Sequence, residues 1–325
     1  MLNVHIPRGT TLERQVVGEA GPIPEGAIWY DLVTPTLPED KLLERTLGIA
    51  VPTREEMQEI EVSSRLYIEN GARYMTATLM CQSDTATPKT TAVTFILSGH
   101  KLVTVRYDEP KPFTLIGNKL ARQCSGSASG ETIMMELLDA VIDRAADILE
   151  RAGAEIDRAS HDIFEPEGRR VDRTITYRYI LKAIGRKGDI TSKVRESLVS
   201  IGRLVLFLTN EADGMKWPKE MRSQLKSMQR DVQSLSDHAT YLSNKVTFLL
   251  DAMIGVMSVE QNNIIKIFSV AAVVLLPPTL VATIYGMNFK NMPELSWEYG
   301  YPLALVLMVL AAVLPYYYFK WKRWL

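Results

Sequence analysis

The uncharged stretch IFSVAAVVLLPPTLVATIYGMNF occupies residues 267–289, between Lys266 and Lys290. A predominantly apolar stretch of about 18 residues or more is long enough to cross the hydrocarbon core of a bilayer, which is about 30 Å thick. A second uncharged stretch, residues 299–319, follows after a short polar segment and ends in the basic tail KWKRWL at residues 320–325. The sequence therefore predicts two membrane-spanning helices, at about 267–288 and at 299–319, joined by an outer loop over residues 290–298.

Basic residues close to the two spans predict their orientation. Lys266 precedes the first span, and the tail after the second span adds Lys320, Lys322 and Arg323. The loop between the spans has Lys290 alone, offset by Glu294 and Glu298. Because Lys and Arg accumulate on the cytoplasmic side of membrane proteins, we expect both termini to be cytoplasmic. The N-terminus has no signal-peptide pattern, so we place this multi-pass protein in the inner (plasma) membrane of the cell.

The composition excludes several functional classes. The chain has 325 residues and a formal net charge of -1, whereas a nucleic-acid-binding protein needs a basic face. Cys81 and Cys124 lie far apart, and the four histidines are scattered without metal-ligand spacing. No Gly-x-Ser-x-Gly nucleophile motif occurs. The sequence therefore favours neither a nucleic-acid partner nor an enzyme.

Residues 1–130 are expected to form a cytoplasmic α/β domain. Short β-rich runs cover residues 27–33, 65–69, 74–80, 92–97 and 101–107, with hairpin turns at Gly71 and at Ser98-Gly99. Residues 38–48 and 53–60 have the pattern of short helices, the first opened by Pro38 and closed by Gly48. Apolar residues at helical spacing then predict a cytoplasmic helical hairpin region over residues 131–218, after a small-residue linker at 125–130.

One long helix is expected over residues 219–289. From Lys219 onward there is no proline before Pro277 and no glycine except Gly255. The predicted helix has about 65 to 70 residues and, at 1.5 Å per residue, a length of about 100 Å. It is a stalk helix that continues into the first membrane span.

A polar stripe runs along this helix. At 100° per residue Asp251, Asn262, Ser269, Leu276 and Thr283 fall within about 60° of one another, and Thr279 lies about 40° beyond. Oxygen-bearing side chains are costly in lipid, so we expect the stripe to face protein or water. Ser and Thr at this spacing also suit plain helix packing, and Asp251 is also consistent with an ordinary carboxylate of the stalk.

Two further features of the first span remain open to two interpretations each. Pro277-Pro278 removes two backbone donors, which indicates either a bend shaped by packing or a point where the helix flexes. Gly286 and Asn288 are typical of a helix C-terminal stop. Free carbonyls beside an asparagine amide would equally suit a hydrated divalent cation, since Mg²⁺ gives up its waters reluctantly.

The C-terminal segment resembles the CorA family of magnesium and cobalt transporters. The resemblance rests on YGMNF at 285–289, MPEL at 292–295, GYP at 300–302 and the Phe319-Lys320 to Trp324-Leu325 ending. FLLDA at 248–252 and EQN at 260–262 are also similar to that family. The motifs that resemble the family lie in roughly the last 85 residues, whereas the α/β domain and the middle helices resemble it in architecture and length only.

The resemblance implies a funnel-shaped homopentamer embedded in membrane lipid, with the first span lining the pore. Gly286, Met287 and Asn288 would form the selectivity filter, with Asp251, Asn262, Leu276 and Thr279 further along the pore. Ser269 and Thr283 are also expected to line the pore, because they lie on the polar stripe. Asn288, Asn262 and Asp251 would contact the ion, and Glu294 would gather cations at the mouth.

The transported ion implied by the resemblance is Mg²⁺, with Co²⁺ as a second ion and Ni²⁺ as a further candidate. Mg²⁺ bound between cytoplasmic domains would also act as the regulatory ion. Asp84, Asp231 and Asp237 are weak candidates for that role and are better interpreted as solvated surface acids. A ZntB-like zinc transporter is the alternative within the superfamily, and a membrane-anchored cytoplasmic sensor is the alternative from another class.

Overall fold

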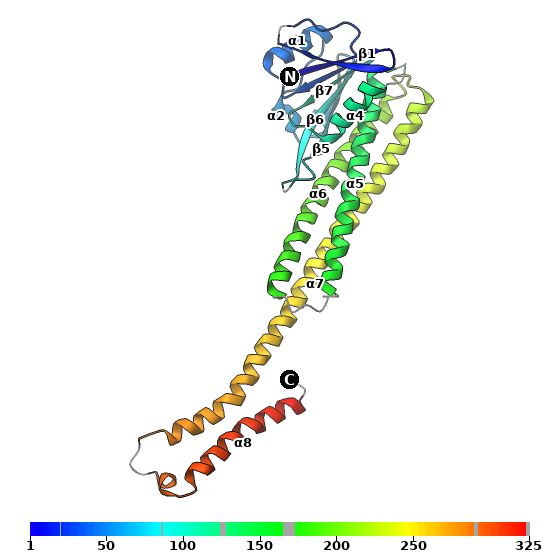
Figure 1. Cartoon of the computed structure of the whole chain (residues 1–325). Coiled ribbons are helices and arrows are strands. Elements are labelled where there is room, and N and C mark those ends of the chain that lie inside the picture. Colours follow the sequence, from blue (N-terminus) through cyan, green and yellow to red (C-terminus); the bar gives the residue numbers. More distant parts are fainter. Residues whose placement is uncertain (20, 86, 124–127, 165–172, 289–291, 323–325) are drawn as a thin grey trace. The chain divides into compact units, whose positions relative to one another are not determined.

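The computed structural model describes residues 1–19, 21–85, 87–123, 128–164, 173–288 and 292–322, without the side chains of residues 173–176, 294 and 295. The chain divides into two compact units, Met1–Leu249 and Leu250–Leu325. Figure 1 shows a sheet with several helices in the first unit and two helices in the second. The long helix α7 contributes residues to both units.

Unit 1 contains a seven-stranded sheet in the order β2-β1-β3-β7-β6-β5-β4. The strands are β1 (Leu2–Arg8), β2 (Thr11–Val17), β3 (Trp29–Val33), β4 (Leu66–Glu69), β5 (Ala72–Cys81), β6 (Lys89–Ser98) and β7 (Lys101–Arg106). β3 and β7 are parallel, and every other neighbouring pair is antiparallel. The sheet is therefore mixed, which agrees with the predicted α/β class.

The helices follow the chain in the expected order. They are α1 (Leu37–Leu47), α2 (Arg54–Gln58), α3 (Val62–Arg65), α4 (Lys111–Arg122), α5 (Gly130–Phe164), α6 (Arg173–Glu211), α7 (Lys219–Tyr285), the 3-10 turn η1 (Pro293–Ser296) and α8 (Gly300–Trp321). The predicted single helix from Lys219 is confirmed, because α7 has 67 residues. α8 begins and ends within two residues of the predicted second span.

Local capping and turn chemistry explain the elements that were predicted. Glu39 caps the backbone N–H of Thr36 at the start of α1, and Gly48 ends that helix with a φ of 65°. Asn70 and Gly71 take φ values of 50° and 78° in the turn between β4 and β5. Two consecutive positive φ values are what a tight hairpin turn requires. Gly99, with a φ of 56°, serves the turn between β6 and β7.

Four elements of unit 1 were not predicted: β1, β2, the short helix α3 and helix α4. The hairpin of β1 and β2 contains Pro7 and a polar edge strand, both of which weaken a strand pattern. Pro7 is tolerated because β3 pairs with β1 only from Leu2 to His5, so no partner on that side needs its missing N–H. Helix α4 was also missed, although Phe113, Ile116 and Leu120 have helical spacing and are buried.

A buried polar cluster lies on one face of the sheet. Arg106 donates to both oxygens of Asp31, at 3.0 and 2.9 Å, and Thr104 donates to Asp31 Oδ1 at 2.8 Å. Trp29 Nε1 donates to Thr104 at 3.0 Å, and the ring of His5 stacks on Trp29 at 4.1 Å. Burial lowers the pKa of His5 to about 4, so the imidazole is neutral at pH 7.

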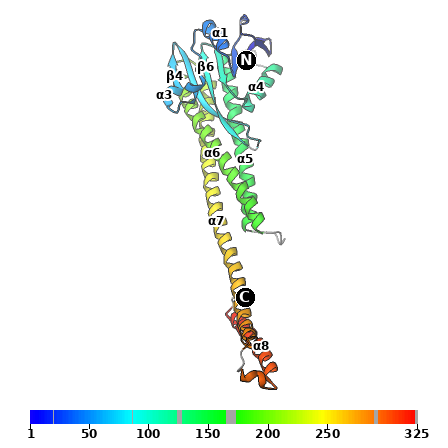
Figure 2. The same ribbon diagram turned by 90° about the vertical axis from the view of Figure 1, so that its left-hand side faces the viewer.

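Helices α5, α6 and the unit 1 part of α7 pack as a bundle (Figure 2). The buried positions of α7 recur at intervals of three, four or seven residues, which is the seam of a coiled coil: Leu225, Met228, Val232, Ala239, Leu242, Val246 and Leu249. Glycines on the neighbouring helices allow close approach to that seam. A Cβ at Gly188 would lie 3.1 Å from Val246, and one at Gly202 would lie 3.2 Å from Val232.

Unit 2 comprises the remainder of α7, η1 and α8, and both helices are long and apolar enough to cross a membrane. Among its described residues the buried hydrophobic side chains are Met253, Val270 and Ala304. The other large apolar side chains of the two helices are mostly exposed in the single chain. An exposed apolar surface of this extent needs lipid or further protein to cover it.

Candidate functional site

The predicted polar stripe lies on the unit 2 part of α7. Asp251, Asn262, Ser269, Thr279 and Thr283 are all exposed in the single chain. Asn262, Ser269, Leu276 and Thr283 recur at seven-residue intervals, and the helix is unbroken across all of them. Because seven residues make nearly two turns, these side chains leave the helix on one side.

The two threonines of the stripe have their hydroxyl protons engaged. Thr279 Oγ1 donates to the carbonyl of Leu275 and Thr283 Oγ1 donates to the carbonyl of Thr279, each at 2.7 Å. A hydroxyl that donates to its own helix keeps its lone pairs as acceptors. These oxygens therefore present negative partial charge, which suits the water shell of a cation.

The other polar side chains of the stripe are free within the described part of the chain. The amide of Asn262, the hydroxyl of Ser269 and the carboxylate of Asp251 make no side-chain hydrogen bond or ion pair there. Leu276, expected at an apolar constriction, is 66% exposed. In the single chain, no described group of unit 2 therefore bonds to the side chains of Asp251, Asn262 or Ser269.

The first span ends at the glycine where the sequence indicated a helix stop, four residues before the predicted end at 289. α7 ends at Tyr285, and Gly286 donates its N–H to the carbonyl of Ala282 at 3.0 Å. Gly286 does not take the left-handed conformation that glycine often adopts at a helix end, although the helix does end directly before it. A Cβ at this position would lie 3.1 Å from the carbonyl oxygen of Ala282. Close approach to the last turn, and not a positive φ, is what favours glycine here.

Met287 and Asn288 follow the helix as exposed, non-helical residues. The N–H of Met287 donates to the carbonyl of Ile284 at 3.2 Å, which holds it against the last turn. Residues 289–291, which follow Asn288, lie outside the described part of the chain. The amide side chain of Asn288 has no hydrogen-bond partner in the described part of unit 2.

The double proline does not interrupt α7. Pro277 and Pro278 lie inside the helix and are half-buried. Neither residue has an N–H, so the carbonyls of Val273 and Val274 receive no helical hydrogen bond from them. These two carbonyls lie one turn before the prolines, between Ser269 and Thr279 of the stripe.

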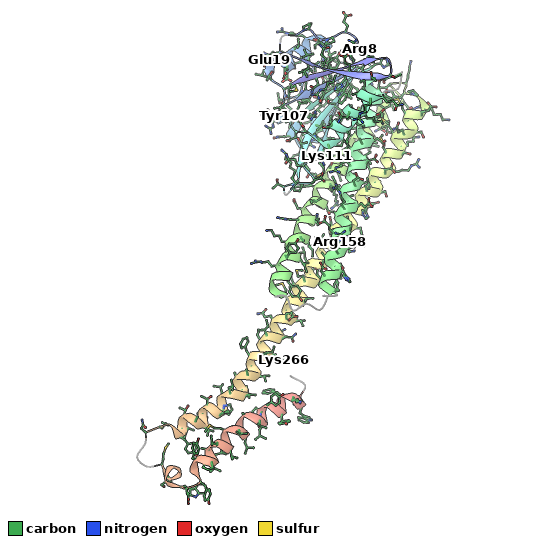
Figure 3. The ribbon with its side chains drawn as sticks, viewed as in Figure 1. Arg8, Glu19, Tyr107, Lys111, Arg158 and Lys266 are labelled. Atoms are coloured by element: carbon green, nitrogen blue, oxygen red, sulfur yellow. The ribbon has the colours of Figure 1, made fainter. Side chains whose placement is uncertain are left out.

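A hollow of about 440 Å³ lies at the start of the first span. Asn262 and Ser269 of the stripe line it together with Lys266 and with Phe319 from α8. The sequence did not indicate that Lys266 and Phe319 approach the stripe, because no local pattern pairs one helix with the other. Lys266 is labelled in Figure 3.

The weak regulatory candidates have different surroundings. Asp84 binds Arg144 at 2.8 Å and Arg151 at 2.9 Å, and it also pairs with Lys111. The hydrogen bond from Lys111 is the main cause that holds the pKa of Asp84 below its ordinary value. Three cations around one carboxylate oppose the binding of Mg²⁺ at Asp84.

The remaining acids offer no built cation site within the described residues. Asp237 accepts a hydrogen bond from Gln233 at 3.1 Å, and Asp231 faces Asp139, whose pKa is raised by burial and by the nearby carboxylates. In the part of the chain that the structure describes, no three His, Cys, Asp or Glu residues gather as a metal site. The side chain of Glu294 lies outside the described part.

Known proteins match this chain over nearly its full length. A family model described as CorA-like Mg²⁺ transporter protein matches residues 24–323. A magnesium transport protein CorA from Pasteurella multocida is 35% identical over 300 residues, covering 92% of each chain. A magnesium transport protein CorA from Escherichia coli K12 is 34% identical over 325 residues and covers 100% of both chains.

Solved structures share the fold at low sequence identity. The complete CorA magnesium transporter of Methanocaldococcus jannaschii aligns with a TM-score of 0.76 at 16% identity, covering 100% of this chain and 99% of that one. The cytoplasmic domain of ZntB from Vibrio parahaemolyticus aligns with a TM-score of 0.57 at 11% identity, over 79% of this chain and 97% of that one. The expected combination of a soluble α/β domain, a long helix and two C-terminal apolar helices is thereby confirmed.

Proposed function

The chain belongs to the CorA-like family of Mg²⁺ transporter proteins, and from that membership we propose that it carries Mg²⁺ across a membrane through a pore lined by α7. Members of the family are channels or transporters and not enzymes, so no catalytic residue is assigned. Two spans in one chain cannot enclose a pore. The proposal therefore includes a homo-oligomer, and specifically a pentamer around the α7 helices.

One observation carries this proposal: the stripe brings exposed polar side chains into an apolar span, and Asp251, Asn262 and Ser269 have no partner in the described part of the chain. If the stripe faced lipid, each free polar group would be unfavourable by several kcal/mol, on the order of the burial cost of an unpaired polar group. If several copies turn the stripe toward a common axis, the same groups contact water and ions. The threonine oxygens, with their protons engaged along the helix, support the second arrangement.

Each site residue then has a distinct proposed role. Gly286, Met287 and Asn288 form the outer filter, where a ring of amide oxygens accepts hydrogen bonds from the water shell of Mg²⁺. Asn262 and Asp251 contact the ion further in, and Leu276 narrows the pore between Asn262 and the outer filter.

The proposal extends to the other ions carried, the orientation in the membrane, the outer mouth and the closure of the pore. Co²⁺ and Ni²⁺ pass the same filter, since their hydrated radii and charge resemble those of Mg²⁺. Both termini are cytoplasmic in the inner (plasma) membrane, because Lys266, Lys320 and Lys322 flank the spans on one side. Glu294 gathers cations at the outer mouth, and intracellular Mg²⁺ closes the pore.

Zinc transport is the competing function within the superfamily. The ZntB cytoplasmic domain shares the fold at 11% identity, whereas the magnesium transport proteins are 34% to 35% identical over at least 92% of the chain. The comparison therefore does not favour zinc. The two ions are separated by measuring Mg²⁺ and Zn²⁺ uptake side by side into liposomes that contain the purified chain; zinc flux without magnesium flux reverses the choice.

The filter and the stripe are tested in the same liposomes. Asn288→Ala should abolish selective Mg²⁺ uptake while the oligomer, measured by light scattering, stays intact. Asn262→Ala should reduce uptake, whereas Asn263→Ala should not, because Asn263 is turned about 100° away on the helix. Asp251→Ala should cause a milder loss that fades at high external Mg²⁺. Equal effects at Asn262 and Asn263 would contradict the stripe, and unchanged flux in Asn288→Ala would contradict the filter.

A further inference from the structure

A second feature of the molecule, unrelated to the stripe, lies at one edge of the sheet in unit 1. β4 pairs with β5 only from Ala72 to Met75, so the outer edge of β5 beyond Met75 has no strand partner among the described strands. Helix α6 lies along that edge instead, and the N–H of Thr78 donates to Ser200 Oγ at 2.9 Å. Figure 2 shows α3 and β4 close to α6. The short β4 leaves a recess there.

The recess has a volume of about 510 Å³, within the range of about 300 to 1,000 Å³ that small-molecule sites occupy. Arg195 and Arg203 of α6 and Arg65 of α3 line it. Arg65 is held in place, since it donates to Thr78 Oγ1 at 3.1 Å and to the carbonyl of Glu59. Arg195 and Arg203 are exposed and have no hydrogen-bond or ion-pair partner within the described part of the chain.

A second recess of about 340 Å³ adjoins the first and shares Arg65 with it. It adds Arg54, which lies 5.3 Å from the ring centroid of Tyr107, and Lys89, which pairs with Asp108 at 2.6 Å. The lining of the two recesses includes five basic side chains, against the carboxylates of Asp108 and Glu196. Since the chain as a whole has a net charge of -1, this edge is a local concentration of positive charge that attracts anions.

The arginines are spaced for an anion longer than one phosphate. Arg195 and Arg203 are eight residues apart on one side of α6, which places their Cα atoms about 12 Å apart along the helix axis. Arginine binds phosphate oxygens in bidentate geometry, and two or three linked phosphates span that interval better than one. Hydroxyl groups of Thr78 and Ser200 at the sheet edge supply further polar contacts.

Two further features narrow the class of ligand. Glu196 lines both recesses without a partner in the described part, and a bare polyphosphate would be repelled by it. Mg²⁺ in proteins is commonly held by one or two carboxylates plus the phosphates of its ligand. A Mg²⁺ ion between Glu196 and the phosphates would bind both and remove their repulsion. The rim also exposes apolar side chains, with Ile60 at 87%, Val62 at 45% and Val199 at 44%. Such a surface suits a flat, weakly polar ring.

The geometry points to a binding site for a magnesium–nucleoside polyphosphate complex between α6 and the edge of β5. Arg65, Arg195 and Arg203 bind the phosphates, Glu196 contacts the Mg²⁺ that bridges them, and the nucleoside lies against the rim of Ile60, Val62 and Val199. The site belongs to unit 1 alone, so it does not depend on the pore assignment.

The test is isothermal titration calorimetry on the purified full chain in detergent, at constant excess Mg²⁺. Saturable binding of MgATP is expected, and the double variant Arg195→Ala/Arg203→Ala should weaken it by about tenfold or more, because each charge-assisted hydrogen bond contributes about 1.5 to 3 kcal/mol. Arg186→Ala is the matched control: it is an exposed arginine on the opposite side of the same helix, about 180° from Arg195. Its affinity should equal that of the wild type.

Two further measurements separate the parts of the proposal. Glu196→Gln should remove most of the difference between MgATP and ATP in EDTA, since that carboxylate is assigned to the metal. Inorganic triphosphate with Mg²⁺ should bind more weakly than MgATP, since it has no ring for the apolar rim. Absence of saturable MgATP binding, or equal affinities for the double variant and the control, overturns the site; equal affinities for MgATP and magnesium triphosphate overturn the nucleoside.

Discussion

Gly130 is the position where one added carbon should do the most damage to unit 1. It begins α5 directly against the turn between β6 and β7, and its N–H donates to the carbonyl of His100 at 2.7 Å. A Cβ at this position would lie 2.5 Å from the nitrogen of Leu102 and 2.6 Å from the carbonyl carbon of Lys101. Both are backbone atoms of a turn fixed by the Ser98–Lys101 pairing and by a 2.8 Å hydrogen bond from Leu102 to Ile28.

The expected loss of stability depends on which part of the backbone the added Cβ would displace. Neither side can yield by a rotamer change, so Gly130→Ala must displace either the start of α5 or the β6–β7 turn. Overpacking against a fixed neighbour reduces stability by about 1 to 3 kcal/mol and occasionally more, and the backbone overlap here places the expected loss at about 3 kcal/mol. For a domain of this size that corresponds to an unfolding temperature lower by about 6 to 12 °C.

The assay is thermal unfolding of the full chain in detergent, followed by the fluorescence of tryptophans that include the buried Trp29. Gly117→Ala in α4 is the matched control, since a Cβ there would meet nothing within 4 Å. Alanine favours a helix over glycine by about 1 kcal/mol, so the control should unfold at the wild-type temperature or above it. If Gly130→Ala unfolds within about 2 °C of Gly117→Ala, the steric argument is wrong.

Two further predictions concern buried charges of unit 1, measured in the same way. Asp31→Ala leaves Arg106 buried without its carboxylate and should reduce stability by about 3 to 5 kcal/mol, whereas Asp147→Ala at the surface should change it by less than about 0.5 kcal/mol. Burial, with Glu44 and Glu39 adding, raises the pKa of Asp40 to about 6, so its protonation stabilises the fold fully below about pH 4 and this contribution is lost as the pH rises through 6. Asp40→Asn should therefore raise the unfolding temperature at pH 7 and change it little at pH 4; the same shift at both pH values would contradict the assignment.

The parts of the fold that the sequence predicted are those with a local cause. The end of α1 at Gly48 and the turn at Gly71 follow from residues that accept positive φ, and these elements were placed correctly. Gly130 shows the opposite case. In the sequence it belongs to a small-residue linker, whereas in the structure it is required by a neighbour some thirty residues away. A glycine needed for close approach looks the same in a sequence as a glycine needed for flexibility.

The same distinction separates the two candidate sites. The polar stripe lies on one helix, where a spacing of seven residues fixes the side on which Asn262, Ser269 and Thr283 emerge, so the sequence alone was sufficient to find it. The recess beside α6 joins Arg65 to Arg195, which are more than a hundred residues apart and share no periodic pattern. What brings them together is the length of β4, whose early end uncovers the edge of β5 that α6 then borders. Lengthening that strand would fill the recess and leave the stripe untouched, so the two sites are physically separable within one chain.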